Sequence, residues 1–241
     1  MADIPTSTLV GAAEAPRPRH TPIPRKLLAC GLIAGPLFLG TLLVLGATRE
    51  GYDPLRHPGS SLALGDLGWT QVVNFLVGGA LTLAFAVGVR RVLRPVGGLW
   101  GPLLIGLWGV TLINAGVFPT DPVSGYPPGT PALPARPTLA GVIHDLGAVP
   151  GFLGLAAACL VFAWWFAVRG ERGWAAYSGL SGVALLVGLA LSSLGFAQTE
   201  GLVEIAGLLQ RGTVAAGFCW MSLLAVRLLR APVRERRRRK A

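Results

Sequence analysis

Charged residues are scarce in this chain of 241 residues: Asp, Glu, Lys and Arg together make up 13% of it, against 52% hydrophobic residues. Soluble domains carry about 25% charged residues, so this composition argues against a soluble protein. The mean hydropathy is positive, at +0.60. We therefore expect a membrane protein.

Cysteine is also rare, and the three that occur, Cys30, Cys159 and Cys219, all lie in apolar stretches. An odd number of membrane-embedded cysteines excludes a disulfide framework and favours a packing role. A cleavable signal peptide is not expected either, because the first apolar stretch is long enough to act as a membrane anchor.

Long apolar stretches are what the chain has instead. Five uncharged stretches exceed the ~20 residues that cross a bilayer core, and they cover residues 27–48, 67–89, 95–120, 146–168 and 173–199. A sixth, 205–226, is long enough only if Arg211 lies inside the membrane. The sequence predicts an all-α, polytopic membrane protein with a transmembrane domain of six helices over residues 27–230. The flanks are predicted to be cytoplasmic tails, disordered over residues 1–26 and basic over residues 231–241.

Acidic residues are outnumbered, at 11 against 21 basic ones. The termini and the second and fourth loops hold 17 of the basic residues, whereas the first, third and fifth loops hold 3. We expect a multi-pass protein of the cell (cytoplasmic) membrane. By the positive-inside rule, both of its termini face the cytoplasm. The basic surplus is thus an orientation signal, and we expect membrane lipids rather than nucleic acid as partners.

Polar residues gather in the expected outer halves of the helices. Such groups need partners or water within hydrocarbon, so we predict a polar cavity that opens outward. The stretch from Gly51 to Phe75 would form its rim. The predicted ligand-binding residues are Arg56, His57, Ser60, Asp66, Gln71, Asn74, Asp121, His144, Asp145, Glu204 and Arg211.

Arg211 is the most costly of these residues, at about 2.5–3.5 kcal/mol near the centre of a bilayer. Two interpretations stay open. Arg211 forms a structural ion pair with Glu204, Asp145, Asp66 or Asp121, or it binds an anionic group of a ligand through its planar guanidinium.

Two other function classes follow from the same residues. A metal-dependent intramembrane hydrolase could use His57, His144 and Asp121, although the histidines lack the HExxH spacing, and we assign no metal ligands, cofactor or catalytic residues. Ser60 and Ser61 beside His57 hold the ingredients of a nucleophile and base without establishing geometry. A structural or accessory subunit would use its polar residues only to hold helices together.

Three segments carry a family resemblance: RHPGSSLALGDLGWTQVVNF, VFPTDPVSGYPPGTP and TLAGVIHD. Together with Gly207, Arg211 and Trp220, they resemble the bacterial integral-membrane family named domain of unknown function 998, over about residues 27–230. The resemblance implies six spans and supplies no catalytic residues. The leading hypothesis is a protein that binds, or binds and translocates, a small polar or anionic molecule or a lipid headgroup.

Overall fold

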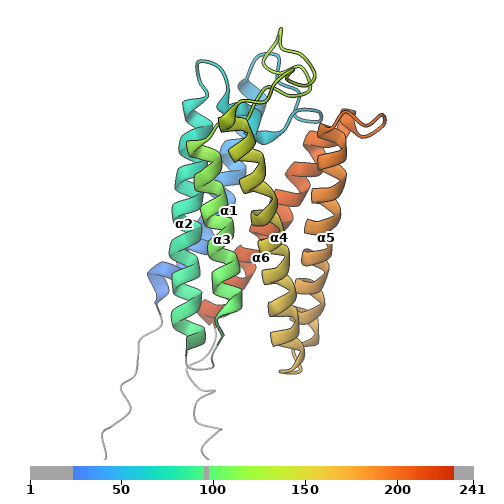
Figure 1. Ribbon diagram of the computed structural model, residues 1–241. Coiled ribbons are helices and arrows are strands. Elements are labelled where there is room, and N and C mark those ends of the chain that lie inside the picture. Colours follow the sequence, from blue (N-terminus) through green and yellow to red (C-terminus); the bar gives the residue numbers. More distant parts are fainter. Residues whose placement is uncertain (1–23, 95–97, 231–241) are drawn as a thin grey trace, which may run out of the picture.

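The computed structural model describes residues 24–94 and 98–230, which form six long helices (Figure 1). They are α1 (Arg25–Thr48), α2 (Trp69–Leu93), α3 (Trp100–Val117), α4 (Leu139–Ala167), α5 (Arg172–Phe196) and α6 (Ala206–Arg230). Two short 3-10 helices, η1 (Gly59–Ala63) and η3 (Val203–Ile205), lie in loops. All six long helices are long and apolar enough to cross a membrane, which confirms the predicted all-helical, multi-pass architecture.

Large apolar side chains cover the outside of the bundle as well as its core. Leu43, Trp164 and Leu180 are 65%, 68% and 71% exposed. A helix that is apolar all round is unfavourable in water, and it is expected where lipid tails take the place of solvent. The low content of charged residues in the sequence therefore corresponds to this apolar outer surface.

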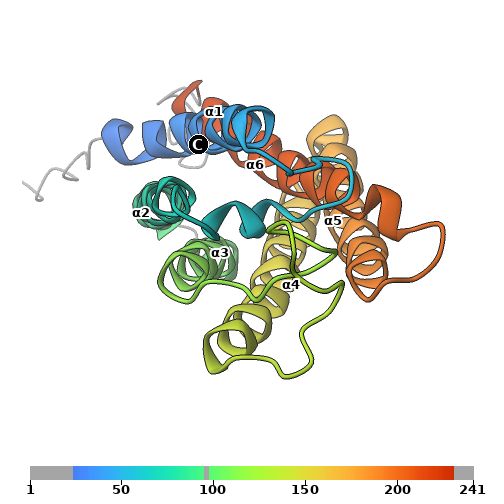
Figure 2. The ribbon, with the colours of Figure 1, turned by 90° about the horizontal axis from the view of Figure 1, so that it is seen from above.

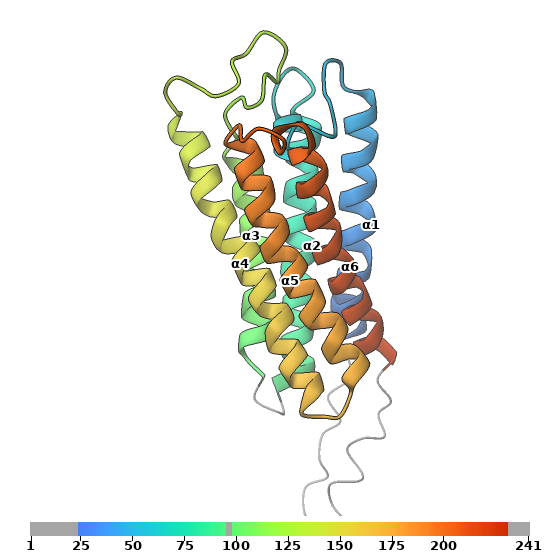
Figure 3. The same ribbon diagram turned by 90° about the vertical axis from the view of Figure 1, so that its right-hand side faces the viewer.

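Each helix packs against the next along the chain, and α6 packs back against α1, which closes a ring (Figure 2). Because successive helices alternate in direction, both ends of the described chain lie at one end of the bundle, here called the terminal end. The loops of residues 49–68, 118–138 and 197–205 meet at the other end, here called the loop end (Figure 3). The polar residues singled out from the sequence belong mostly to the loop end.

Two glycines four residues apart on α4, Gly147 and Gly151, let α3 and α4 approach closely. A Cβ atom at Gly147 would collide with Asn114, and one at Gly151 would collide with Thr111. Both polar side chains instead donate hydrogen bonds across this interface: Thr111 Oγ1 to the Gly147 carbonyl (3.1 Å) and Asn114 Nδ2 to the Ile143 carbonyl (3.1 Å). These polar groups are satisfied inside the membrane by the neighbouring backbone.

The helix bounds differ most from the prediction at α4, which begins at Leu139 rather than at residue 146. The predicted span began after Asp145, because it was defined by the absence of charge, whereas the helix begins six residues before that aspartate. Thr138 caps the helix N-terminus, where its hydroxyl accepts a hydrogen bond from the Gly141 amide at 3.0 Å. His144 and Asp145 therefore lie within the helix. The predicted N-terminal tail covered residues 1–26, but its last two residues, Arg25 and Lys26, lie in α1. Residues 1–23 of that tail and the predicted C-terminal tail of residues 231–241 are outside the described residues.

Candidate functional site

The first loop, residues 49–68, is held against α6 by Arg211. Arg211 Nη1 donates to the backbone carbonyls of His57 (3.0 Å), Gly207 (3.0 Å) and Pro54, and Nη2 donates to the Tyr52 hydroxyl. The guanidinium also lies over the Tyr52 ring, with 5.3 Å between Cζ and the ring centroid. Arg211 thus joins the sixth helix to a loop about 150 residues earlier in the chain.

The position of Arg211 differs from the one assumed from the sequence. It lies five residues after the start of α6, about 7.5 Å along the helix and near the loop end. Within the described residues, no carboxylate forms an ion pair with it; the ion pair observed there joins Arg227 and Glu171 at the terminal end (2.9 Å). Arg211 is therefore surrounded by carbonyl and hydroxyl oxygens in place of the carboxylates that we considered.

Close backbone approach makes this arrangement possible. A Cβ atom at Gly207 would lie 2.5 Å from the His57 carbonyl oxygen and 2.8 Å from that of Pro54. The Leu208 amide lies in the first turn of α6, where amides have no acceptor within the helix, and it donates to the Leu55 carbonyl at 2.9 Å. The first loop thereby supplies acceptors to the start of α6, and glycine at position 207 leaves the room.

Tyr52 and His57 of the first loop and Tyr126 of the third form an aromatic cluster. Their ring centroids are 5.1–5.5 Å apart, with Tyr52 and Tyr126 edge to face. Burial raises the pKa of Tyr52 to about 12, although the nearby Arg211 charge opposes that shift. Tyr52 is thus neutral at physiological pH, and its hydroxyl lies 3.0 Å from the Pro58 carbonyl oxygen, to which it donates.

His57 is buried and uncharged in this setting. Its Nδ1 accepts a hydrogen bond from the Asp53 amide at 2.9 Å, so the neutral ring carries its proton on Nε2. Burial lowers the pKa of His57 below 6.5, and a hydrogen bond with the Ser124 backbone partly opposes the shift. Protonation of Nδ1 would cost the ring its bond with Asp53, so we assign His57 a loop-organising position.

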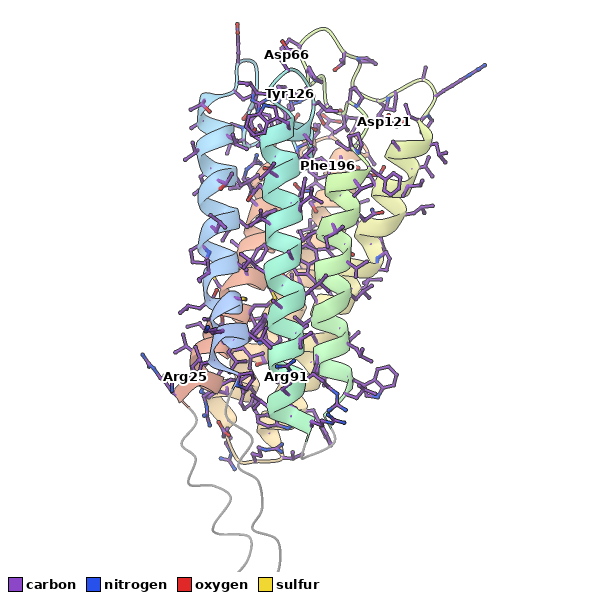
Figure 4. All side chains as sticks on the ribbon, turned by 90° about the vertical axis from the view of Figure 1, so that its left-hand side faces the viewer. Arg25, Asp66, Arg91, Asp121, Tyr126 and Phe196 are labelled. Carbon is purple, nitrogen blue, oxygen red and sulfur yellow. The ribbon has the colours of Figure 1, made fainter. Side chains whose placement is uncertain are left out.

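The third loop, residues 118–138, lies over the first. Arg56 Nε donates to the Ser124 carbonyl (3.3 Å), and Gln198 Nε2 from the fifth loop donates to the Ser124 hydroxyl (3.0 Å). Tyr126, from the same third loop, and Asp66, from the first loop, are both labelled at the loop end in Figure 4. Ser124 therefore connects all three loops, a connection that the sequence left open.

Asp121 closes the third loop onto the start of α4. Its carboxylate accepts hydrogen bonds from the Thr138 amide (2.8 Å) and from the Thr138 hydroxyl (2.7 Å). Negative charge near a helix N-terminus is favourable because the first amides of the helix lack acceptors. Asp121 is engaged here as a helix-terminal acceptor, away from Arg211.

Beneath the loops lies a cavity of about 70 Å³ among α1, α2, α3, α4 and α6. Most of its walls are apolar and aromatic, including Phe38, Phe75, Trp108 and Phe152. Its polar lining residues are Ser60, Gln71, Thr111, His144, Gln210 and Arg211. At about 15 Å³ per water, the cavity has room for a group as large as about five water molecules.

Two hydrogen-bond donors in this lining have no partner. Gln71 Nε2 and Trp108 Nε1 are both buried without a hydrogen bond in the described structure, and their side chains are 0% and 2% exposed. The rest of the Gln71 amide is engaged, since its Oε1 accepts from Asn74 Nδ2 at 3.2 Å. Asn74 in turn donates to the Phe38 carbonyl at 3.2 Å. Unpaired buried donors are rare, because each costs about 1–3 kcal/mol.

His144 reaches the cavity from α4. Its Nδ1 lies 2.8 Å from the Phe118 carbonyl oxygen, which can only accept, so Nδ1 carries a proton. In the neutral ring Nε2 is then an acceptor. The tautomer of His144 is therefore opposite to that of His57.

The predicted site residues fall into three groups. Ser60, Gln71, His144 and Arg211 line the cavity. Those in the loops or behind the cavity wall are Arg56, His57, Asn74 and Asp121. Those exposed at the surface are Asp66, Asp145 and Glu204.

The metal hypothesis grouped His57, His144 and Asp121. These side chains have separate partners, respectively Asp53, Phe118 and Thr138. Across residues 24–94 and 98–230, no three His, Cys, Asp or Glu side chains are placed to hold one metal ion.

Several cavity and loop residues were missed from the sequence. Trp108 looked like an ordinary apolar residue of the third span, and Gln210 was overlooked beside Arg211, although its Oε1 accepts from the Gly59 amide at 2.8 Å. Tyr52 had one usable signal, a position in the polar stretch that we singled out. Ser124 and Tyr126 had none, because only tertiary packing brings the third loop to the first.

The family assignment rests on the chain as a whole. The profile of the family described as "Protein of unknown function (DUF998)" matches residues 32–227, from α1 into the last turn of α6. Neither a search of curated proteins nor a search of solved structures found a match. With most of its length matched, six apolar helices included, the chain belongs to the DUF998 family of proteins of unknown function.

Proposed function

We propose that the cavity binds one small molecule, or one lipid headgroup, that presents hydrogen-bond acceptor oxygens. The observation that carries this proposal is the pair of unpartnered donors, Gln71 Nε2 and Trp108 Nε1, in one cavity lining. An acceptor between them offsets a cost of about 1–3 kcal/mol for each donor.

Charge and shape support an anionic ligand with a short apolar part. Arg211 lines the cavity, and its positive charge has no carboxylate partner within the described residues. The aromatic walls formed by Phe38, Phe75 and Phe152 suit a few carbon atoms. A carboxylate or phosphate oxygen near the donors, with its carbon part against these rings, satisfies both features.

The same proposal gives Arg211 two tasks. Its bonds to the first loop position Gly59 and Ser60 at the cavity, and its charge favours the anion. The two interpretations that the sequence left open, structural and ligand-binding, are thereby combined, with carbonyl groups in place of an acidic partner.

A pair of tryptophan variants tests the proposal. Trp108→Phe removes an unpartnered donor, so co-purified ligand should fall at least tenfold, while the protein without ligand loses only the packing of the larger ring. Trp220→Phe is the matched control, because Trp220 Nε1 already donates to Ser178 Oγ at 3.1 Å, away from the cavity. We expect this control to lose similar packing, to lose about 1 kcal/mol more of stability for its hydrogen bond, and to keep its ligand.

Native mass spectrometry of the purified proteins, with bound molecules released and identified, supplies the measurement. Equal amounts of the same molecules in wild type and Trp108→Phe, or an empty wild-type protein, would overturn the proposal. Gln71→Leu repeats the test with the second donor; it also removes the Oε1 acceptor of Asn74 Nδ2, which keeps its bond to the Phe38 carbonyl.

We further propose that the loop end faces the outside of the cell and that both termini are cytoplasmic. The supporting observation is the distribution of 17 against 3 basic residues. In a chain whose native cysteines are replaced, Asp66→Cys should react with a membrane-impermeant maleimide on intact cells, and Gly170→Cys should not. The reverse pattern would refute the orientation and leave the binding proposal standing.

A further inference from the structure

A second hollow lies at the terminal end of the bundle, away from the cavity. It is a groove of about 760 Å³ between α2 and α3, on the face turned toward the viewer in Figure 4. Its walls are mostly aliphatic, and they include Leu83, Val87, Leu103 and Val110. Gly106 leaves it open, because a Cβ atom there would meet only Ala86, at 3.8 Å.

Three arginines lie at one end of this groove: Arg90, Arg91 and Arg94, in and just after the last turns of α2. Arg91 is labelled at the lower end of α2 in Figure 4. None of the three forms an ion pair with a described acidic residue. The groove therefore combines an apolar body with a concentrated positive charge at its end.

Arg90 distinguishes this cluster from a set of solvated arginines that only orient the helix. Its Nη1 is buried and has no hydrogen-bond partner among the described residues. A buried guanidinium nitrogen without an acceptor is costly, and phosphate oxygens match the guanidinium geometry well. An anionic group beside Arg90 would resolve that deficit.

The length of the groove matches a lipid. Leu83 and Arg94 are 11 residues apart on α2, which corresponds to about 16 Å along the helix. One leaflet is half of a hydrocarbon core of about 30 Å. With the arginines at the headgroup level, Leu83 lies near the middle of the bilayer. The groove is then long enough to hold an acyl chain across one leaflet.

We propose that this groove is a binding site for an anionic phospholipid, with an acyl chain between α2 and α3 and the phosphate at Arg90, Arg91 and Arg94. The site is separate from the cavity and does not depend on the function proposed for it. Basic pockets between membrane helices bind anionic headgroups for the same physical reason.

Lipid binding by the full-length protein in mild detergent provides the test. Native mass spectrometry should find phosphatidylglycerol bound at least tenfold more tightly than phosphatidylcholine with the same chains. Glycerol phosphate, which lacks chains, should not displace the lipid at equal concentration. Equal binding of the two lipids, or displacement by glycerol phosphate, would overturn the proposal.

Two variants assign the site. Replacing Arg90, Arg91 and Arg94 together by Gln should weaken phosphatidylglycerol binding by about 100-fold, at roughly fivefold for each charge. Gly106→Phe should fill the groove and lower the binding of both lipids while leaving every charge in place. Arg172→Gln, an exposed arginine at the same end on α5, is the control and should bind like wild type. Wild-type affinity in the triple variant, or equal loss in the control, would refute the assignment, and a thermal unfolding curve checks that each variant is folded.

Discussion

Replacing Arg211 by Gln should release the first loop from α6. The substitution removes the guanidinium that donates to the carbonyls of Pro54 and His57 and to the Tyr52 hydroxyl. A hydrogen bond from a charged donor contributes about 1.5–3 kcal/mol, and the bond to Pro54 is exposed and therefore worth less. The bonds to His57 and Tyr52 together give a loss of about 3 kcal/mol, or about a 150-fold higher population of the open loop.

Amide hydrogen exchange measures this opening directly. The amide of His57 donates to the Asp53 carbonyl (2.8 Å) and that of Ser61 to the Pro58 carbonyl (3.1 Å), so both are protected only while the loop is closed. In Arg211→Gln both should exchange about 150-fold faster. Amides in the middle of α3 should keep the exchange rates of wild type.

Arg56→Gln is the matched control for the Arg211 variant. Arg56 lies in the same loop and has the same charge, but it makes one bond of 3.3 Å, to the Ser124 carbonyl. We expect less than fivefold acceleration from its loss. Unchanged exchange in Arg211→Gln, or equal acceleration in both variants, would refute the role given to Arg211.

Three further predictions concern the same loop. Gly207→Ala should destabilise the protein by about 1–3 kcal/mol in a denaturation assay, because its Cβ would lie 2.5 Å from the His57 carbonyl oxygen. Gly212→Ala is the control and should be neutral or slightly stabilising, because the space around its Cβ is open. Equal effects of the two substitutions would contradict the close approach at Gly207. Acidification should destabilise the loop, because burial lowers the pKa of His57 below the 6.5 of the unfolded chain, so the unfolded chain takes up a proton first as the pH falls. His57→Asn should weaken this pH dependence of amide exchange. A loop equally protected at pH 5 and pH 7.5 would contradict the prediction. Alkaline pH should also destabilise the protein, through Tyr52, whose pKa of about 12 exceeds the ordinary 10.0. Between these two values the unfolded chain loses its proton first, so stability falls by about 2–3 kcal/mol as the pH rises, and Tyr52→Phe should show a smaller fall in alkaline denaturation.

Asp121 and Arg211 show which features of the site could be predicted from the sequence. Both were recognised as costly polar groups near the membrane, and both are engaged in the structure. Their partners could not be derived, because Thr138 and the His57 carbonyl are respectively 17 and 154 residues away. A backbone carbonyl carries no sequence signal, since every residue has one.

The start of α4 illustrates a different limit. A window defined by the absence of charge ends at Asp145, whereas the helix begins at Leu139. Thr138, a residue type that commonly caps helices, is a readable signal for that start, and the charge criterion made no use of it. A single carboxylate near the end of a span does not stop a helix, because its side chain is exposed at the surface of the bundle.

The sequence by itself determined that the chain is a bundle of six apolar helices, because hydrocarbon admits only segments whose backbone groups are paired internally, and such segments have a length and composition that can be counted. It also indicated the end of the bundle where polar residues gather. Tertiary structure alone decided that Arg211 binds carbonyls in place of a carboxylate, that Ser124 joins three loops, and that Gln71 and Trp108 share one cavity with unpaired donors. These outcomes depend on which surfaces meet when the ring of helices closes, and contacts between distant segments leave no local pattern in a single sequence.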